Sequence, residues 1–107
     1  MEGIRRPVAT YRIIFQSGHD RFDAHIEVGD AKSRSVGFLT FVREGKSLPK
    51  ANINPTDKML HLFFPSAMLG AVLDALRYEK SLQIELLGTG GSLMSNTRTM
   101  EPIGKNQ

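Results

Sequence analysis

Residues 22–28 constrain the fold of this chain more than any other part of the sequence. The apolar residues of this segment are Phe22, Ala24, Ile26 and Val28, and the residues between them are Asp23, His25 and Glu27. Successive side chains of a β-strand point to opposite faces of a sheet, so this strict alternation predicts a strand. One face of the resulting sheet should be buried and the other should be accessible to solvent.

Other segments also have the composition of strands. β-Branched, aromatic and leucine residues are concentrated in residues 8–16, 36–42, 58–64 and 81–87. A more polar sixth strand is expected at 93–100, after a glycine-rich turn at 88–92. Residues 47–57 include prolines and asparagines, so a long irregular loop is predicted there.

A helix is predicted over residues 65–79. The proline at its start is tolerated because the first backbone N–H groups of a helix have no intrahelical partner. Apolar residues follow with the spacing of one helix face, namely Leu69, Val72, Leu73 and Leu76. A second apolar stripe, called here the helix stripe, consists of Met68, Ala71, Ala75 and Tyr78. The helix therefore has more apolar surface than a single small core requires.

These elements together predict an α+β fold. The expected order is β-β-β-β-α-β-β, in which a mainly antiparallel sheet of five or six strands packs against one amphipathic helix. A chain of 107 residues fits a single domain spanning 1–107, and we expect residues 1–6 and 102–107 to be frayed.

The composition excludes several classes of protein. The chain contains no cysteine, so disulfides and thiolate sites play no part. No run of about 18 apolar residues is present, and the first residues lack the apolar stretch of a signal peptide. We therefore expect a cytoplasmic protein that does not enter a membrane. No residue pattern assigns it a cofactor.

The charge distribution favours single-stranded nucleic acid as a ligand. Lysine and arginine outnumber aspartate and glutamate by 14 to 11, and positive charge is concentrated in residues 31–58. Proteins that bind single strands combine a cationic surface with aromatic rings on which bases stack. The residues expected to contact phosphates are Arg12, Lys32, Arg34, Arg43, Lys46 and Lys50, and Phe41 is expected to stack on a base. In topology alone, the order of four strands and a helix is similar to that of small single-stranded-DNA-binding modules of the transcriptional-coactivator kind.

Self-association is a further expectation. An open sheet leaves two edge strands whose unpaired backbone groups can pair with another chain. Homodimers commonly bury apolar stripes, so we expect a homo-oligomer, most simply a dimer, whose interface includes Met68, Ala71, Ala75 and Tyr78. The same strand edge and helix stripe also support an alternative function, that of a protein–protein interaction module.

An enzyme is the third hypothesis. His19, Asp23, His25 and Glu27 bring imidazoles and carboxylates close together in the sequence, and such groups bind divalent ions or transfer protons. The exposed face of a strand also needs polar residues for solubility alone, and no recognised metal-binding spacing is present. We therefore assign no catalytic residue and no metal ligand, and a binding module is the leading prediction.

Overall fold

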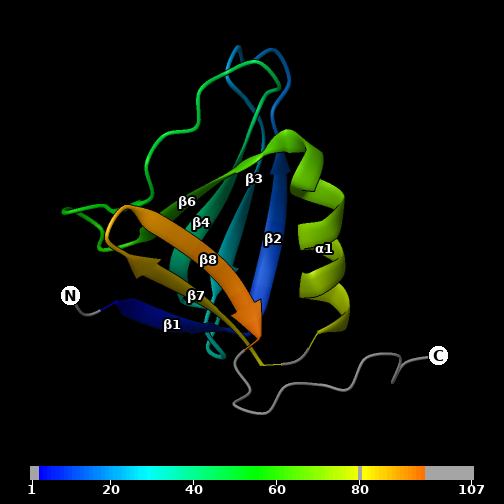
Figure 1. Cartoon of the computed structure of the whole chain (residues 1–107). Coiled ribbons are helices and arrows are strands. Elements are labelled where there is room, and N and C mark those ends of the chain that lie inside the picture. Colours follow the sequence, from blue (N-terminus) through cyan, green and yellow to red (C-terminus); the bar gives the residue numbers. More distant parts are fainter. Residues whose placement is uncertain (1–2, 80, 96–107) are drawn as a thin grey trace.

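Two β-sheets and one helix surround a common hydrophobic core (Figure 1). The computed structural model describes residues 3–79 and 81–95. In chain order its elements are β1 (Ile4–Val8), β2 (Thr10–Phe15), β3 (Phe22–Gly29), β4 (Ser35–Val42), β5 (Asn52–Ile53), β6 (Leu60–Pro65), a 3₁₀ turn (Ser66–Met68), α1 (Leu69–Tyr78), β7 (Leu82–Leu87) and β8 (Gly90–Ser95). The predicted α+β fold, with mostly antiparallel strands and one helix, is confirmed, but the strands form two sheets instead of one.

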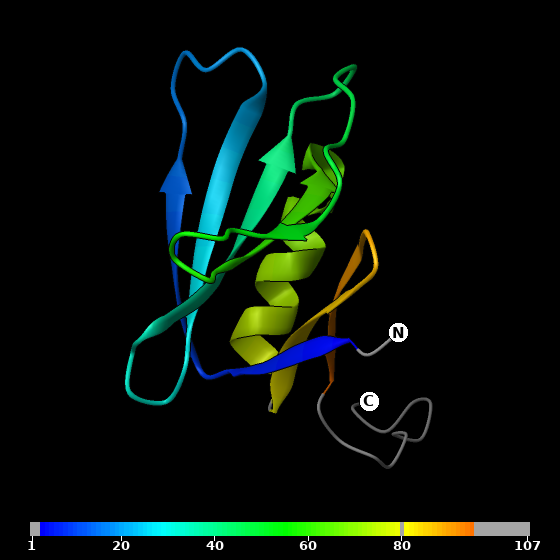
Figure 2. The same ribbon diagram turned by 90° about the vertical axis from the view of Figure 1, so that its left-hand side faces the viewer.

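The larger sheet has five strands in the order β2-β3-β4-β6-β5. β2, β3 and β4 form an antiparallel meander, whereas β6 runs parallel to β4. The connection between these two parallel strands contains β5, which pairs antiparallel with β6 at one edge of the sheet. The loop predicted at 47–57 therefore includes a short strand. Figure 2 shows β2 at the opposite margin of the sheet.

The smaller sheet has three antiparallel strands in the order β1-β7-β8. The prediction that residues 1–6 fray is wrong for residues 4–6, which pair with β7. This pairing joins segments far apart in the chain, so no local pattern indicates it. β8 begins earlier than the strand predicted at 93–100, and residues 96–100 and 102–107 lie outside the described part of the chain.

The single strand predicted over 8–16 is divided between the two sheets. The chain leaves the smaller sheet after Val8 and enters the larger one at Thr10. Ala9 lies at the change of direction, and its N–H donates a hydrogen bond to the carbonyl of Gly29 at 2.8 Å. Residues 8–16 thereby contribute side chains to both sheets.

The core lies between the two sheets and α1. Its buried side chains in the larger sheet are Ala24, Ile26, Val28, Leu39, Phe41, Leu60 and Leu62. The smaller sheet contributes Ile84 and Leu86 to the same cluster, and α1 contributes Val72. Ala24, Ile26 and Val28 lie on the buried side of β3, as the period of two predicts. The prediction that Phe22 shares this side is wrong, because a register shift between Phe22 and Ala24 interrupts the alternation and the ring of Phe22 reaches the opposite face.

The predicted helix is confirmed as the 3₁₀ turn followed by α1. The residues of α1 that pack against the core or lie within it are Leu69, Val72, Leu73 and Leu76. The helix ends after Tyr78, where the N–H of Glu79 donates a hydrogen bond to the carbonyl of Ala75 at 2.9 Å. Its opposite side faces away from both sheets.

Candidate functional site

The face of the larger sheet opposite the core carries two rows of directly paired residues. The first row crosses four strands and consists of Ile14, His25, Thr40 and Phe63. The second row crosses five strands and consists of Arg12, Glu27, Phe38, His61 and Asn52. Residues directly opposite one another on paired strands share a face, so both rows lie on the outer surface of the sheet.

An open groove of about 400 Å³ lies between these rows. We call it the aromatic groove, and its lining residues are Ile14, Phe22, His25, Phe38, Thr40, His61 and Phe63. Three of these residues are phenylalanines and two are histidines. Among the described residues, no aspartate, glutamate, lysine or arginine lines it.

Ring-to-ring contacts define the shape of the groove. Phe38 stacks on His61 at a centroid distance of 5.4 Å and an interplanar angle of 29°. Phe22 lies 6.4 Å from Phe63 and meets His25 edge-on at 5.5 Å. These distances fall within the range of favourable aromatic pairs. The rings therefore hold one another in place and present a preformed surface.

The two histidines of the groove differ in their hydrogen bonding. His25 Nδ1 and Thr40 Oγ1 form a hydrogen bond of 2.9 Å, and Thr40 is buried. His61 Nε2 is also enclosed, but it has no hydrogen-bond partner among the described residues. A buried polar atom without a partner is uncommon and energetically costly. A polar group of a ligand could bond to this atom only if the imidazole ring moved to expose it.

The groove is uncharged at neutral pH on the His25 side. Burial lowers the pKa of His25 below its ordinary value near 6.5, and the positive charges of His19 and His61 in their protonated forms lower it further. His25 consequently stays neutral at pH 7. A ligand in the groove meets an imidazole ring and not an imidazolium.

Phe41 does not belong to this surface. Its side chain is 0% exposed and packs in the core, where it stacks on Phe64 at 5.8 Å. The expectation that Phe41 stacks on a base is therefore wrong, because the ring has no accessible face. β4 alternates between its two sides, so the neighbouring outward positions, Phe38 and Thr40, reach the groove instead.

The basic residues expected to contact phosphates are divided between the two ends of β4. Lys32 and Arg34 precede this strand, whereas Arg43 and Lys46 follow it. An extended strand of this length separates Arg34 from Arg43 by roughly 30 Å. Lys50 lies in the loop before β5 and is exposed. The structure therefore does not gather these residues into one compact cationic patch.

Three of the arginines pair with carboxylates of their own chain. Their ion pairs are Arg12 with Glu27 at 2.6 Å, Arg34 with Asp30 at 2.9 Å and Arg43 with Asp23 at 3.0 Å. A phosphate group would have to compete with a carboxylate at each of these positions. Arg12 and Glu27 do not line the aromatic groove, and as an ion pair they add no net charge to this face of the sheet.

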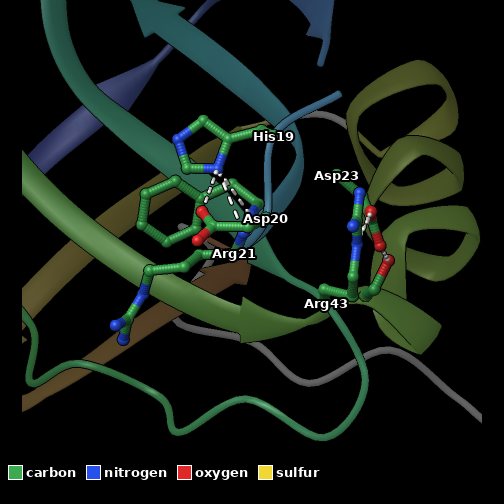
Figure 3. A network of polar contacts seen from close by, with 7 residues as sticks. His19, Asp20, Arg21, Asp23 and Arg43 are labelled. Carbon is green, nitrogen blue, oxygen red and sulfur yellow. Dashed lines mark hydrogen bonds and ion pairs between the residues drawn. The ribbon is translucent and has the colours of Figure 1, made fainter. Parts of the chain in front are cut away.

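The four residues of the enzyme hypothesis do not converge. Figure 3 shows two separate polar groups, one around His19 and one around Asp23 and Arg43. Asp23 accepts hydrogen bonds from Ser66 Oγ at 2.6 Å and from Arg43 Nε at 3.0 Å, and these two bonds lower its pKa. In the part of the chain that the structure describes, no group of three histidine, aspartate or glutamate side chains is placed to hold a metal ion.

His19 has a structural role in the turn before β3. Its Nδ1 accepts hydrogen bonds from the backbone N–H groups of Arg21 at 3.1 Å and Phe22 at 3.2 Å. The imidazole ring also stacks on Phe22 at 4.9 Å. His19 therefore positions Phe22, which lines the aromatic groove.

The helix stripe faces solvent in the single chain. Met68 is 42% exposed and Tyr78 is 78% exposed, and Ala71 is exposed as well. Ala75 is half-buried. This stripe is thus accessible to a partner, and its role in self-association stays a prediction.

Sequence reasoning missed most of the aromatic groove. Composition alone allows Phe22, Phe38 and Phe63 to be assigned to a core, whereas the alternation with Leu60 and Leu62 already predicts that His61 faces outward. The signal that would have found them is the alternation within residues 58–64, where Leu60 and Leu62 are buried and the residues between them face outward. Combined with the outward His25, this alternation places aromatic residues on the accessible face.

Comparison with known proteins identifies no relative. No protein-family model matches the chain, and neither the curated proteins nor the solved structures include a significant match. Within residues 3–79 and 81–95, no helix has both the length and the apolar character needed to cross a membrane. The function is therefore inferred from the chemistry of the aromatic groove.

Proposed function

We propose that the protein is a binding module that holds a planar, uncharged ring in the aromatic groove. The observation that carries this proposal is the set of three phenylalanines and two histidines around one open groove without a lining charge. Ligand sites are typically concave and mostly apolar, with a few polar groups that fix orientation. The volume of about 400 Å³ lies in the range of such sites.

The ring would be held by two kinds of interaction. Its faces would pack against Phe38 and Phe63, which lie on the neighbouring strands β4 and β6. Its edge would offer a hydrogen-bonding group to His61 Nε2, which lacks a partner in the described chain and would become accessible through a rotation of the imidazole ring. A heteroaromatic ring combines these two features, because it has an apolar face and a polar edge.

Such a ring can come from two sources. One is a base of a single-stranded nucleic acid, and the other is a free heteroaromatic compound. The net charge of +3 favours the nucleic acid, whereas the paired arginines and their separation along β4 favour the free compound. If the ligand is a nucleic acid, the stacking residues are Phe38 and Phe63 and not Phe41.

Two substitutions test whether the groove binds the ring. Phe38→Leu and Phe63→Leu keep an apolar side chain but remove the flat surface, and each should weaken binding by about tenfold or more. The control is Tyr78→Leu, which also removes an aromatic ring, at a side chain on α1 that is 78% exposed and lies outside both the groove and β2. Circular dichroism would verify that all three variants are folded.

The two probes are a fluorescein-labelled oligothymidylate and adenosine. Affinity for the oligonucleotide that falls steeply with salt supports the nucleic acid as the source. Binding of adenosine with little dependence on salt supports the free compound. If neither probe binds, or if Tyr78→Leu weakens binding as much as Phe38→Leu does, the proposal is wrong.

A further inference from the structure

β2 is an edge strand with nothing beside it in the described chain. It pairs with β3 on one side, and Figure 2 shows its other side at the margin of the larger sheet. Proteins usually protect such an edge with proline, lysine, a bulge or a covering segment. β2 has the sequence TYRIIF and pairs with β3 in an unbroken register. The charged side chain of Arg12 is therefore the one usual protection within β2, which contains no proline, lysine or bulge.

The register shows which backbone groups of β2 are open. Gln16, just after the strand, donates its N–H to the carbonyl of Asp23 at 2.9 Å. Hydrogen-bonded residues alternate along an antiparallel pair, so Thr10, Arg12 and Ile14 also direct their N–H and C=O groups toward β3. The N–H and C=O groups of Tyr11, Ile13 and Phe15 therefore point away from the sheet.

These three residues form a self-complementary set. If a second copy of β2 adds antiparallel about a two-fold axis at Ile13, the two Ile13 residues lie opposite each other. Tyr11 then lies opposite Phe15 of the other copy, and this aromatic pair occurs twice. Every open N–H and C=O group of Tyr11, Ile13 and Phe15 finds a partner in this register.

The exposed apolar surface of β2 fits the same arrangement. Tyr11 is 36% exposed and Phe15 is 68% exposed, although both are aromatic. On the opposite side of the strand, Ile14 is 37% exposed. Directly opposed aromatic side chains stabilise antiparallel strand pairs. Pairing with a second copy would cover Tyr11 and Phe15 with each other.

Charge does not oppose this pairing. Arg12 is the one charged residue of β2, and in the proposed register it lies opposite Ile14 of the other copy. Its guanidinium is also 2.6 Å from Glu27 of its own chain, so the charge is already neutralised. No like charges are placed directly opposite each other.

From these observations we propose that two copies of this chain form a dimer by antiparallel pairing of β2 with β2 about Ile13. The two larger sheets then become one continuous sheet, and the aromatic grooves of both copies lie on the same face. The proposal rests on the edge of β2 and does not depend on what the groove binds.

The first test measures mass and register in the full chain. Sedimentation equilibrium should give twice the single-chain mass of 11.9 kDa as concentration rises. The chain has no cysteine, so Ile13→Cys introduces a single thiol that faces its own copy across the axis. Oxidised glutathione should convert this variant to a covalent dimer. Ile14→Cys is the control, because its thiols are two residues out of register and too far apart to bridge.

A second test uses two double variants with substitutions at the same positions. Tyr11→Lys/Phe15→Lys places like charges opposite each other twice and should yield a monomer. Tyr11→Glu/Phe15→Lys places opposite charges at those positions and should retain the dimer. Both variants lose the same aromatic side chains, so a difference between them reports the register.

Several results would overturn the proposal. The first is a chain that sediments as a monomer at every concentration at which it stays in solution. Equal cross-linking of Ile13→Cys and Ile14→Cys would also exclude the register. A dimer that survives both double variants equally lies at another surface, such as the helix stripe.

Discussion

Phe38 and His61 lie directly opposite each other on the parallel strands β4 and β6, and their rings stack at 5.4 Å. The same His61 has an enclosed Nε2 without a hydrogen-bond partner in the described chain. His19 stacks on Phe22 in a similar way, but its Nδ1 accepts two backbone hydrogen bonds. The two stacked histidines therefore differ in whether their polar atoms are satisfied.

This difference predicts opposite effects for the same substitution. His61→Phe keeps a ring against Phe38 and removes the unpartnered nitrogen, so it should raise the free energy of unfolding by about 1 kcal/mol. His19→Phe removes the acceptor of two backbone N–H groups and should lower it by ~1 kcal/mol. Urea unfolding measures both, and equal signs for the two variants would contradict this account.

The lowered pKa of His25 predicts a dependence of stability on pH. The unfolded chain binds a proton at His25 near pH 6.5, whereas the folded chain binds it only at lower pH. The contribution of His25 to stability is therefore present above about pH 6.5 and is lost as pH falls through the folded pKa. The urea concentration at the midpoint of unfolding should decrease as the pH is lowered from about 7.5 to about 5. His25→Gln should make this decrease in the midpoint smaller. A decrease of unchanged size would show that other titratable groups cause the pH dependence.

Substituting alanine for glycine should have opposite effects on stability at two positions. A methyl group on Gly37 would lie 2.6 Å from Ile84 Cδ1 and 2.8 Å from the carbonyl oxygen of Leu60. Gly37→Ala should therefore cost about 1–3 kcal/mol of unfolding free energy through overpacking. Gly70 lies in α1, and beyond its chain neighbours and the backbone of its own helix no heavy atom lies within 4 Å of an added methyl group, so Gly70→Ala should stabilise by ~0.5–1 kcal/mol. Thermal unfolding of the two variants would measure both effects.

The burial of Phe41 predicts a large cost for its truncation. Phe41→Ala leaves a cavity in the core and should lower the free energy of unfolding by about 3–5 kcal/mol. Phe15 is mostly exposed, so Phe15→Ala should change it by no more than about 0.5 kcal/mol in the single chain. Urea unfolding at low protein concentration makes the comparison. Similar costs for the two variants would mean that Phe41 is not a core residue.

Local pattern was sufficient for the parts of the fold that repeat regularly. The alternation in residues 22–28 predicted β3 and the burial of Ala24, Ile26 and Val28, but it failed for Phe22, which lies before a register shift and reaches the opposite face. The spacing of Leu69, Val72, Leu73 and Leu76 predicted α1 and its core-facing side. In both cases the periodicity of the apolar residues reports the burial of one side of an element, which is a local property.

Local pattern failed where a residue's environment depends on a distant segment. Residues 8–16 read as one strand, because nothing in their composition marks Ala9 as the point where the chain changes sheet. Ile4, Arg5 and Arg6 read as a frayed end, because their partner β7 lies near the other end of the chain. Phe41 and Phe38 have the same side chain in one strand, yet only the packing of α1 and the smaller sheet decides which of them is buried.

By itself, the sequence determined that this chain forms strands and one amphipathic helix, because apolar periodicity is encoded residue by residue. Only the tertiary structure decided that the strands divide into two sheets and that β4 pairs in parallel with β6. That pairing places Phe38 beside His61 and forms the aromatic groove. It also leaves β2 at an open edge, because strand order arises from contacts between segments that no local pattern can specify.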